Sequence, residues 1–198
     1  MAARWSVLAR TAQTSQPIAG GLDTGASLVT TTPPRLARRR INLAVIDVVR
    51  GSDYPLPFDA PCRDRERKRL GDAAGLSQFG VNLLRLPPGT WSSQRHWQIA
   101  SDEFVYVVSG EVVLITDAGE ETLGAGDAAG FKAGTPDGHH LQNRSTSEAL
   151  VLEVGTRLPG DGCYYSDIDM MIIDDSMVGH TRRDGTPYAR RSSNGEAE

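Results

Sequence analysis

The stretch RHWQIASDEF, residues 95–104, places His96, Gln98 and Glu103 close together, and each can bind a metal or position a proton. The chain has only 4 histidines, and two others, His139 and His140, are neighbours in one later segment. Imidazole and carboxylate groups bind divalent transition metals and also exchange protons during catalysis. Either chemistry requires that the fold bring the two segments to one site.

Strand geometry would allow this convergence, because side chains two residues apart in a β-strand point to the same face. In a strand that contains HWQ, His96 and Gln98 share a face, and in the next strand Glu103 shares a face with small valines. In HHLQN, His139 and His140 take opposite faces. An inward carboxylate is unfavourable without a partner. Two histidines and one carboxylate inside a barrel suit Fe(II), and Mn, Zn, Ni or Cu with less selectivity.

Residues 80–156 supply strands of the required kind. Gly, Pro, Asn and Asp interrupt short apolar segments about every 8–12 residues, which is typical of an all-β antiparallel sandwich or barrel. No segment in this range shows a sustained period of 3.6, so no helix is predicted there. The expected strands are GVNLLRL, SSQRHWQI, SDEFVYVVSG, EVVLITD, ETL, AAGFKA, HHLQN and ALVLEVGT.

Together with the histidines and the glutamate, the surrounding glycines form a pattern that resembles the two motifs of the cupin superfamily, G…HxH…E…G and G…PxG…H…N. The resemblance covers roughly residues 80–156, and the wider chain is similar to a group of single-domain bacterial cupins. It implies an antiparallel jelly-roll β-barrel in which histidines and a glutamate hold a divalent metal ion, such as Fe, Mn, Zn or Ni. The matching residues are Gly89, His96, Glu103, Gly110, Gly126, Asp127, Gly134, His139 and Asn143.

The resemblance places His96, Glu103 and His139 at metal-ligand positions, with Glu103 also able to act as a catalytic base. Two residues depart from the pattern. Gln98 stands where the second histidine usually stands, and Lys132 replaces the usual proline of the second motif. An amide oxygen is a weaker ligand than imidazole for transition metals, so Gln98 is expected to contribute weakly to the metal site.

The segments outside the core have separate expectations. Residues 1–40 are expected to be a flexible extension, with organellar targeting as the alternative. Residues 41–79 are expected to hold a first strand, INLAVIDVV, and then a long connecting segment. A short helix is predicted over residues 63–70, where arginines alternate with acidic residues as on a solvated, ion-paired helix face. Residues 157–198 are expected to add a further strand and a polar tail.

Composition bears on the partners and the location. With 198 residues, a net charge of −4 and a pI near 5.6, the chain has no overall field for nucleic acid or an anionic membrane. No apolar run approaches about 18 residues, so no membrane span is expected. Cys62 and Cys163 form no CxxC site, which favours a reducing, cytoplasmic location and leaves a disulfide between them open. His180 is expected to be solvated.

The predicted surface favours association. The strand face that carries Phe104 and Tyr106, together with the apolar first strand, predicts a homodimer with two-fold symmetry. The alternative is that the tail segment YYSDIDMMIID of the same chain covers these surfaces.

Two classes of function follow. The first is a metal-dependent dioxygenase, isomerase or lyase that acts on a small polar metabolite inside the barrel, where open coordination positions accept the substrate. Gln98 favours the second, a non-catalytic binding or sensor protein with a degraded metal site. A weaker third hypothesis is metal-free sugar-nucleotide chemistry with a His–Asp pair, as in cupin-like epimerases.

Overall fold

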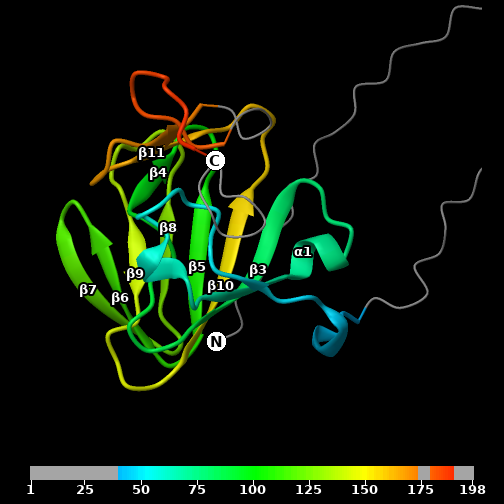
Figure 1. Ribbon diagram of the computed structural model, residues 1–198. Coiled ribbons are helices and arrows are strands. Elements are labelled where there is room, and N and C mark those ends of the chain that lie inside the picture. Colours follow the sequence, from blue (N-terminus) through cyan, green and yellow to red (C-terminus); the bar gives the residue numbers. More distant parts are fainter. Residues whose placement is uncertain (1–39, 174–178, 190–198) are drawn as a thin grey trace, which may run out of the picture. The chain divides into compact units, whose positions relative to one another are not determined.

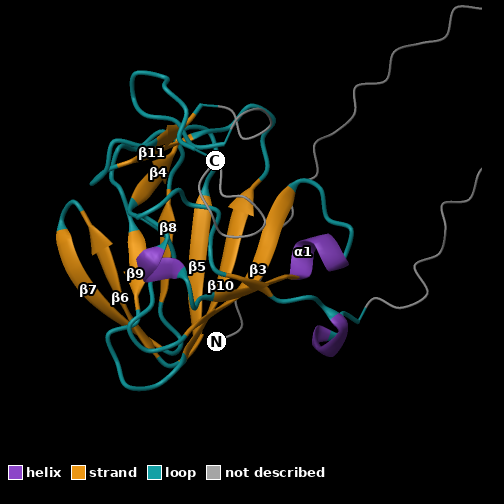
Figure 2. Cartoon of the chain, in the orientation of Figure 1, coloured by secondary structure: helices purple, strands orange, loops and turns teal. Residues whose placement is uncertain are grey.

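The computed structural model of the chain describes residues 40–173 and 179–189. Almost all regular structure in these residues is antiparallel strand, which confirms the all-β prediction (Figure 2). No helix occurs between residues 80 and 156, as the absence of a helical period predicts. None of the described helices is long and apolar enough to span a membrane.

The strands are β1 (Val49–Arg50), β2 (Glu66–Arg69), β3 (Phe79–Leu86), β4 (His96–Gln98), β5 (Glu103–Ser109), β6 (Glu111–Thr116), β7 (Gly119–Gly124), β8 (Ala128–Phe131), β9 (His140–Gln142), β10 (Ala149–Thr156), β11 (Cys163–Tyr165) and β12 (Met171–Ile172). The helices are the 3₁₀ helices η1 (Leu43–Val45) and η2 (Ala60–Cys62) and the α-helix α1 (Leu70–Ala73).

The strands form two layers. One is a six-stranded antiparallel sheet in the order β1-β2-β3-β10-β5-β8 (Figure 1). The other consists of two three-stranded sheets, β12-β11-β4 and β7-β6-β9, which an isolated bridge between His96 and His139 connects. The result is a jelly-roll sandwich whose sheets do not close into a continuous barrel. The predicted jelly-roll class is confirmed.

The main core lies between the six-stranded sheet and β7-β6-β9. Strand alternation explains its composition, because in β5 Val107 is buried while Tyr106 and Val108 are exposed on the opposite face. Burial of each large aliphatic side chain contributes about 1.5–3 kcal/mol to the stability of the fold. The core residues are Leu84, Leu86, Val107, Val112, Leu114, Leu123, Leu141, Ala149 and Val151.

A second apolar cluster lies beneath β11 and contains both cysteines, together with Tyr54, Tyr165 and Met170. The two thiols are free, which answers the question that the cysteine count leaves open. Burial raises the pKa of Cys62 to about 11 and that of Cys163 to about 12. Both thiols are therefore protonated at neutral pH and act as small apolar side chains.

The strand predicted over residues 41–49 is wrong for most of its length. Its centre forms η1, whose first turn is capped by the Asn42 side chain, which accepts a hydrogen bond from the backbone N of Ala44 at 3.1 Å. Only Val49 belongs to a strand, and Val45 remains 75% exposed. The apolar residues that indicate a strand in the sequence lack a neighbouring strand to pair with.

The helix predicted over residues 63–70 is also wrong, because residues 66–69 form β2 and α1 begins only at Leu70. A strand separates alternate residues onto two faces. Glu66 lies on the outer face and forms an ion pair with Arg85, whereas Arg67 lies on the inner face and pairs with Glu153. Basic and acidic residues alternate here with the period of two that a strand requires. The same alternation can be mistaken for the mixed charges of a solvated helix.

The prediction that His180 is solvated is wrong as well. Its ring lies 5.3 Å from that of Tyr54, and its Nε2 lies 3.4 Å from the hydroxyl of Tyr165. The segment 179–189 is therefore packed against the second apolar cluster. The sequence offers no periodic signal for this contact, because His180 lies in a segment whose described part has only isolated bridges.

Candidate metal centre

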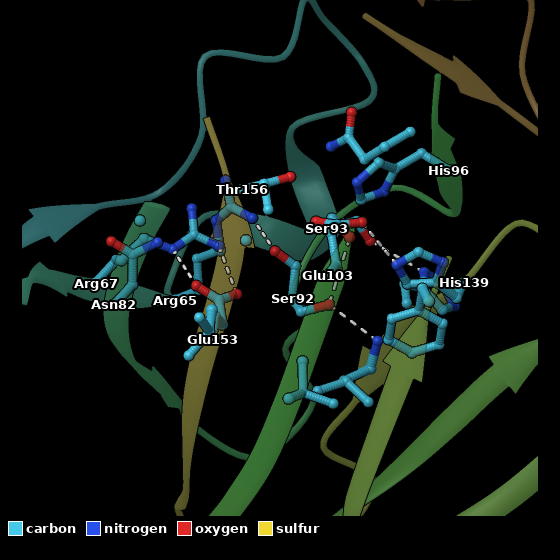
Figure 3. A pocket seen from close by; sticks show the side chains of 18 of the residues that line it. Arg65, Arg67, Asn82, Ser92, Ser93, His96, Glu103, His139, Glu153 and Thr156 are labelled. Carbon is cyan, nitrogen blue, oxygen red and sulfur yellow. Dashed lines mark hydrogen bonds and ion pairs between the residues drawn. The ribbon is translucent and has the colours of Figure 1, made fainter. Parts of the chain in front are cut away.

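Three potential metal ligands meet where the two layers come together at β4, β5 and the start of β9. His96 and His139 pair across an antiparallel bridge, with backbone N–O distances of 3.2 and 2.9 Å and ring centroids 5.3 Å apart. Glu103, the first residue of β5, approaches from the other layer, and its Oε2 lies 3.0 Å from His139 Nε2 (Figure 3). One potential ligand atom from each residue lies within 4.8 Å of the others.

His96 has the orientation and the protonation state that a metal ligand needs. Its Nδ1 lies 2.9 Å from the backbone carbonyl oxygen of Gln94, so Nδ1–H donates there and the Nε2 lone pair remains for the site. Burial lowers the pKa of His96, and the nearby Glu103 carboxylate opposes this effect. His96 is therefore neutral at pH 7, as metal ligation requires.

Glu103 carries a charge in a largely buried position. Burial alone would raise its pKa, but the hydrogen bond from His139 and the electrostatic influence of His96 lower the pKa below its ordinary value. A hydrogen bond from the Gln98 side chain acts in the same direction. Glu103 is thus an ionised carboxylate at neutral pH, and Gln98 is in contact with it.

His139 is held by packing more than by hydrogen bonds. Its ring stacks on Phe131 with a centroid distance of 3.4 Å, while the buried Nδ1 has no hydrogen-bond partner among the described residues. Its Nε2 is 3.0 Å from Glu103 Oε2. Two ligand atoms that each lie ~2.1 Å from one metal ion, at right angles, are about 3 Å apart. This spacing and the neutral His96 fit a divalent metal ion.

His140 lies outside the cluster, on the opposite face from His139, as the alternation predicts. Its ring packs on Trp91 with a centroid distance of 4.7 Å, and its Nδ1 lies 3.0 Å from the backbone oxygen of Ser93. Burial lowers the pKa of His140 to about 4, so the ring is neutral and serves to anchor the loop before β4.

The cluster lies at one end of a pocket of about 360 Å³ that Gln98 also lines. The sequence reasoning missed the polar residues at the other end, where Arg67 and Glu153 form a two-bond ion pair at 2.7 and 2.8 Å (Figure 3). Two signals could have found them. The arginines at 65 and 67 alternate as inward residues of a strand, and Glu153 is a lone acid in the apolar strand ALVLEVGT.

The fold is an antiparallel jelly roll in which two histidines and a glutamate face an internal pocket and form a candidate metal centre. The sequence profile described as "Cupin domain" matches residues 82–155. Together with a 46% identical structure described as from a cupin superfamily, 98% of which this chain covers, the match shows that the chain belongs to the cupin superfamily.

Solved structures extend the comparison. A crystal structure from Silicibacter pomeroyi, named a sugar phosphate isomerase from a cupin superfamily, is 46% identical, covers 79% of this chain and 98% of its own, and has a TM-score of 0.72. A putative sugar phosphate isomerase from Acidithiobacillus ferrooxidans is 27% identical, with 64% and 81% covered and a TM-score of 0.58. No curated protein matches the chain.

Proposed function

We propose that the protein is a metal-dependent isomerase that acts on a small sugar phosphate inside the jelly roll. The observation that carries the proposal is the convergence of His96, Glu103 and His139 at one end of a polar pocket. The 46% identity to a protein named a sugar phosphate isomerase supports the choice of reaction among those that cupins perform.

The residues that would hold the metal are His96, Glu103 and His139, with Gln98 as a weaker fourth ligand or as the residue that positions Glu103. A bound divalent ion polarises a carbonyl oxygen and stabilises the negative charge that develops on it. The neutral state of His96 and the ionised state of Glu103 match what such an ion requires of its ligands.

Isomerisation of an aldose to a ketose moves a proton between two adjacent carbon atoms. The base removes a proton from the hydroxyl-bearing carbon beside the carbonyl and returns it to the former carbonyl carbon, while the hydroxyl proton passes to the former carbonyl oxygen, so the reaction needs no other reactant. Glu103 is the candidate base, acting when its carboxylate leaves the metal, because it is ionised and faces the pocket.

The test is turnover of sugar phosphates by protein purified without an affinity tag. The metal is removed with a chelator and then Mn, Fe, Zn or Ni is added back, and aldose–ketose conversion is followed by NMR across a panel of sugar phosphates. We expect turnover with at least one metal and none after chelation. Turnover that is equal before and after chelation, or no turnover with any pair of sugar and metal, would contradict the proposal.

A pair of matched variants tests whether Glu103 is the catalytic base. Glu103→Gln should lower kcat at least ~100-fold while the fold is retained, because general base catalysis contributes about 10²–10⁴-fold. Glu148→Gln is the control, since Glu148 is an exposed glutamate paired with Arg85 at the surface. Its activity should match the wild type.

Gln98 favours a second function, a non-catalytic protein that binds the same class of metabolite. Replacement of a strong ligand by an amide weakens the metal site without removing the pocket. Saturable sugar phosphate binding without turnover, under every metal condition, would support this function.

A further inference from the structure

Arg65, just before β2, is a buried charged side chain with only 6% of its surface exposed. Its Nε donates to the backbone oxygen of Gly51 at 2.9 Å, and its Nη1 donates to the backbone oxygen of Ser92. The guanidinium carbon lies 5.8 Å from the centre of the Tyr54 ring. These contacts fix the direction of the side chain.

Within residues 40–173 and 179–189, no carboxylate forms an ion pair with Arg65. Its neighbours in the sequence differ, because Arg63 pairs with Asp59 and Arg67 pairs with Glu153. A guanidinium has five N–H donors, and the two hydrogen bonds leave Nη2 without an acceptor in the described chain. A buried cation without a counter-ion is unfavourable unless something else compensates the charge.

Arg65 lines the pocket that holds the candidate metal centre (Figure 3). The other charged groups of this pocket already have partners. Arg67 and Glu153 neutralise each other, Arg157 pairs with Asp72, and Glu103 contacts His139. Arg65 is therefore the cation in the pocket lining that has no carboxylate partner among the described residues, and the pocket is suited to an anionic group.

We propose that Arg65 binds the phosphate group of the substrate and thereby sets its orientation in the pocket. The phosphate would lie against Arg65, near Ser92 and Tyr54, and the reacting carbons would lie toward Glu103 and His96, which line the same pocket (Figure 3). A planar guanidinium offers parallel N–H donors that match phosphate oxygens, and its charge-assisted bonds are stronger than neutral ones. The identity of the anion as a sugar phosphate rests on the proposed function, whereas the unpaired guanidinium in the pocket is a feature of the structure.

The direct test is calorimetric titration of the metal-free protein with inorganic phosphate. The wild type should show saturable binding. Arg65→Lys should weaken it at least tenfold, because an ammonium group cannot make the paired contact. The matched control is Arg69→Lys, the same change at an exposed arginine of β2, which should stay within twofold of the wild type. No saturable binding by the wild type, or equal binding by Arg65→Lys, would overturn the proposal.

Acetate is the second probe, because a carboxylate could use the same arginine. Acetate binding as tight as phosphate binding, with the same loss in Arg65→Lys, would overturn the assignment to phosphate. Asn82→Asp covers the case in which Arg65→Lys does not fold, since it keeps the side-chain shape and adds a negative charge to this pocket. It should weaken phosphate binding severalfold, and unchanged affinity would overturn the proposal.

Kinetics separate this inference from the proposed reaction. If the protein isomerises a sugar phosphate, Arg65→Lys should raise KM at least tenfold with a much smaller change in kcat, because Arg65 is a positioning residue away from the reacting atoms. Isomerase activity with an unchanged KM would overturn the role of Arg65 alone. Phosphate binding that depends on Arg65, without isomerase activity, would support this inference and contradict the proposed reaction.

Discussion

At the scale of single residues, position 98 determines how strongly the site can hold a metal. Gln98 shares the pocket with the candidate ligands and donates a hydrogen bond that helps to keep Glu103 ionised. We predict that Gln98→His raises the occupancy of Zn, Ni or Fe, because it adds an imidazole on the same strand face. Gln98→Ala should lower metal affinity and leave the fold intact. Elemental analysis after identical loading measures both effects.

Metal occupancy should be highest in Gln98→His, lower in the wild type and lowest in Gln98→Ala. Equal occupancy in all three would show that residue 98 takes no part in the site. An empty wild-type site with recovery in Gln98→His would move the conclusion to the non-catalytic binding protein. Circular dichroism of each variant checks that the differences do not come from unfolding.

At the scale of elements, the sequence predicts a strand well where one face of the strand is buried. It predicts poorly where strand formation depends on pairing with a segment far along the chain. The alternation in β5 places Val107 inside and Tyr106 outside, as the pattern indicates. β2 was missed because its inward residue is the charged Arg67, so that no apolar period shows. Residues 43–45 read as strand by composition, yet pairing depends on neighbours far along the chain. The same holds for Arg65, whose role depends on a pocket formed by other strands.

Gly110, between β5 and β6, tests how tightly the elements of the main core are joined. Its φ is +80°, and an added Cβ would lie 2.5 Å from the backbone oxygen of Glu148. Gly89 has the same φ but no atom within 4 Å of an added Cβ. Gly89→Ala should cost only the backbone strain, about 1–2 kcal/mol. Gly110→Ala should cost clearly more, about 3 kcal/mol or above, because the clash is with backbone.

Urea unfolding followed by circular dichroism measures the two free energies of unfolding. The Gly89→Ala variant is the internal control for the left-handed conformation. Equal losses in both variants would show that the turn at Gly110 can move away from β10 without cost.

The segment 179–189 should loosen at mildly acidic pH. Burial lowers the pKa of His180 below 6.5, with the Asp53 charge opposing the shift. The unfolded state therefore takes up a proton at higher pH than the folded state, so stability is full above about 6.5 and falls as the pH drops toward the folded-state pKa. We predict faster amide hydrogen exchange in 179–189 at pH 5.5 than at pH 7.5, after correction for the intrinsic pH dependence of exchange.

His180→Phe is the matching variant, since it retains the ring contact with Tyr54 and removes the titrating group. The extra exchange at low pH should disappear in this variant. Other buried histidines, such as His96 and His140, also resist protonation, so only the difference between the two proteins reports on His180. The same pH response in both would assign the effect elsewhere.

At the scale of the whole molecule, the outer face of the six-stranded sheet carries exposed apolar side chains. Phe104, Tyr106 and Val108 are 45, 40 and 47% exposed, and Leu152 and Val154 are half-buried beside them. The alternative that the tail covers this face does not hold for its described part, because β11 and β12 belong to the other layer. Apolar residues gathered on one sheet face favour a partner surface.

We predict a two-fold homodimer that buries this face. A standard interface buries about 800 Å² per partner, so the interface would extend from β5 onto the neighbouring β10 and β3. Light scattering at micromolar concentration should give twice the mass of the 21.3 kDa chain. The double variant Phe104→Ser/Tyr106→Ser should give the single mass, because it removes the two aromatic side chains of the face.

Ile173→Ser is the control, since Ile173 is 61% exposed but lies outside this sheet, and it should remain dimeric. A single-chain mass for the wild type, or a dimer that survives the double variant, would mean that this face is not the interface.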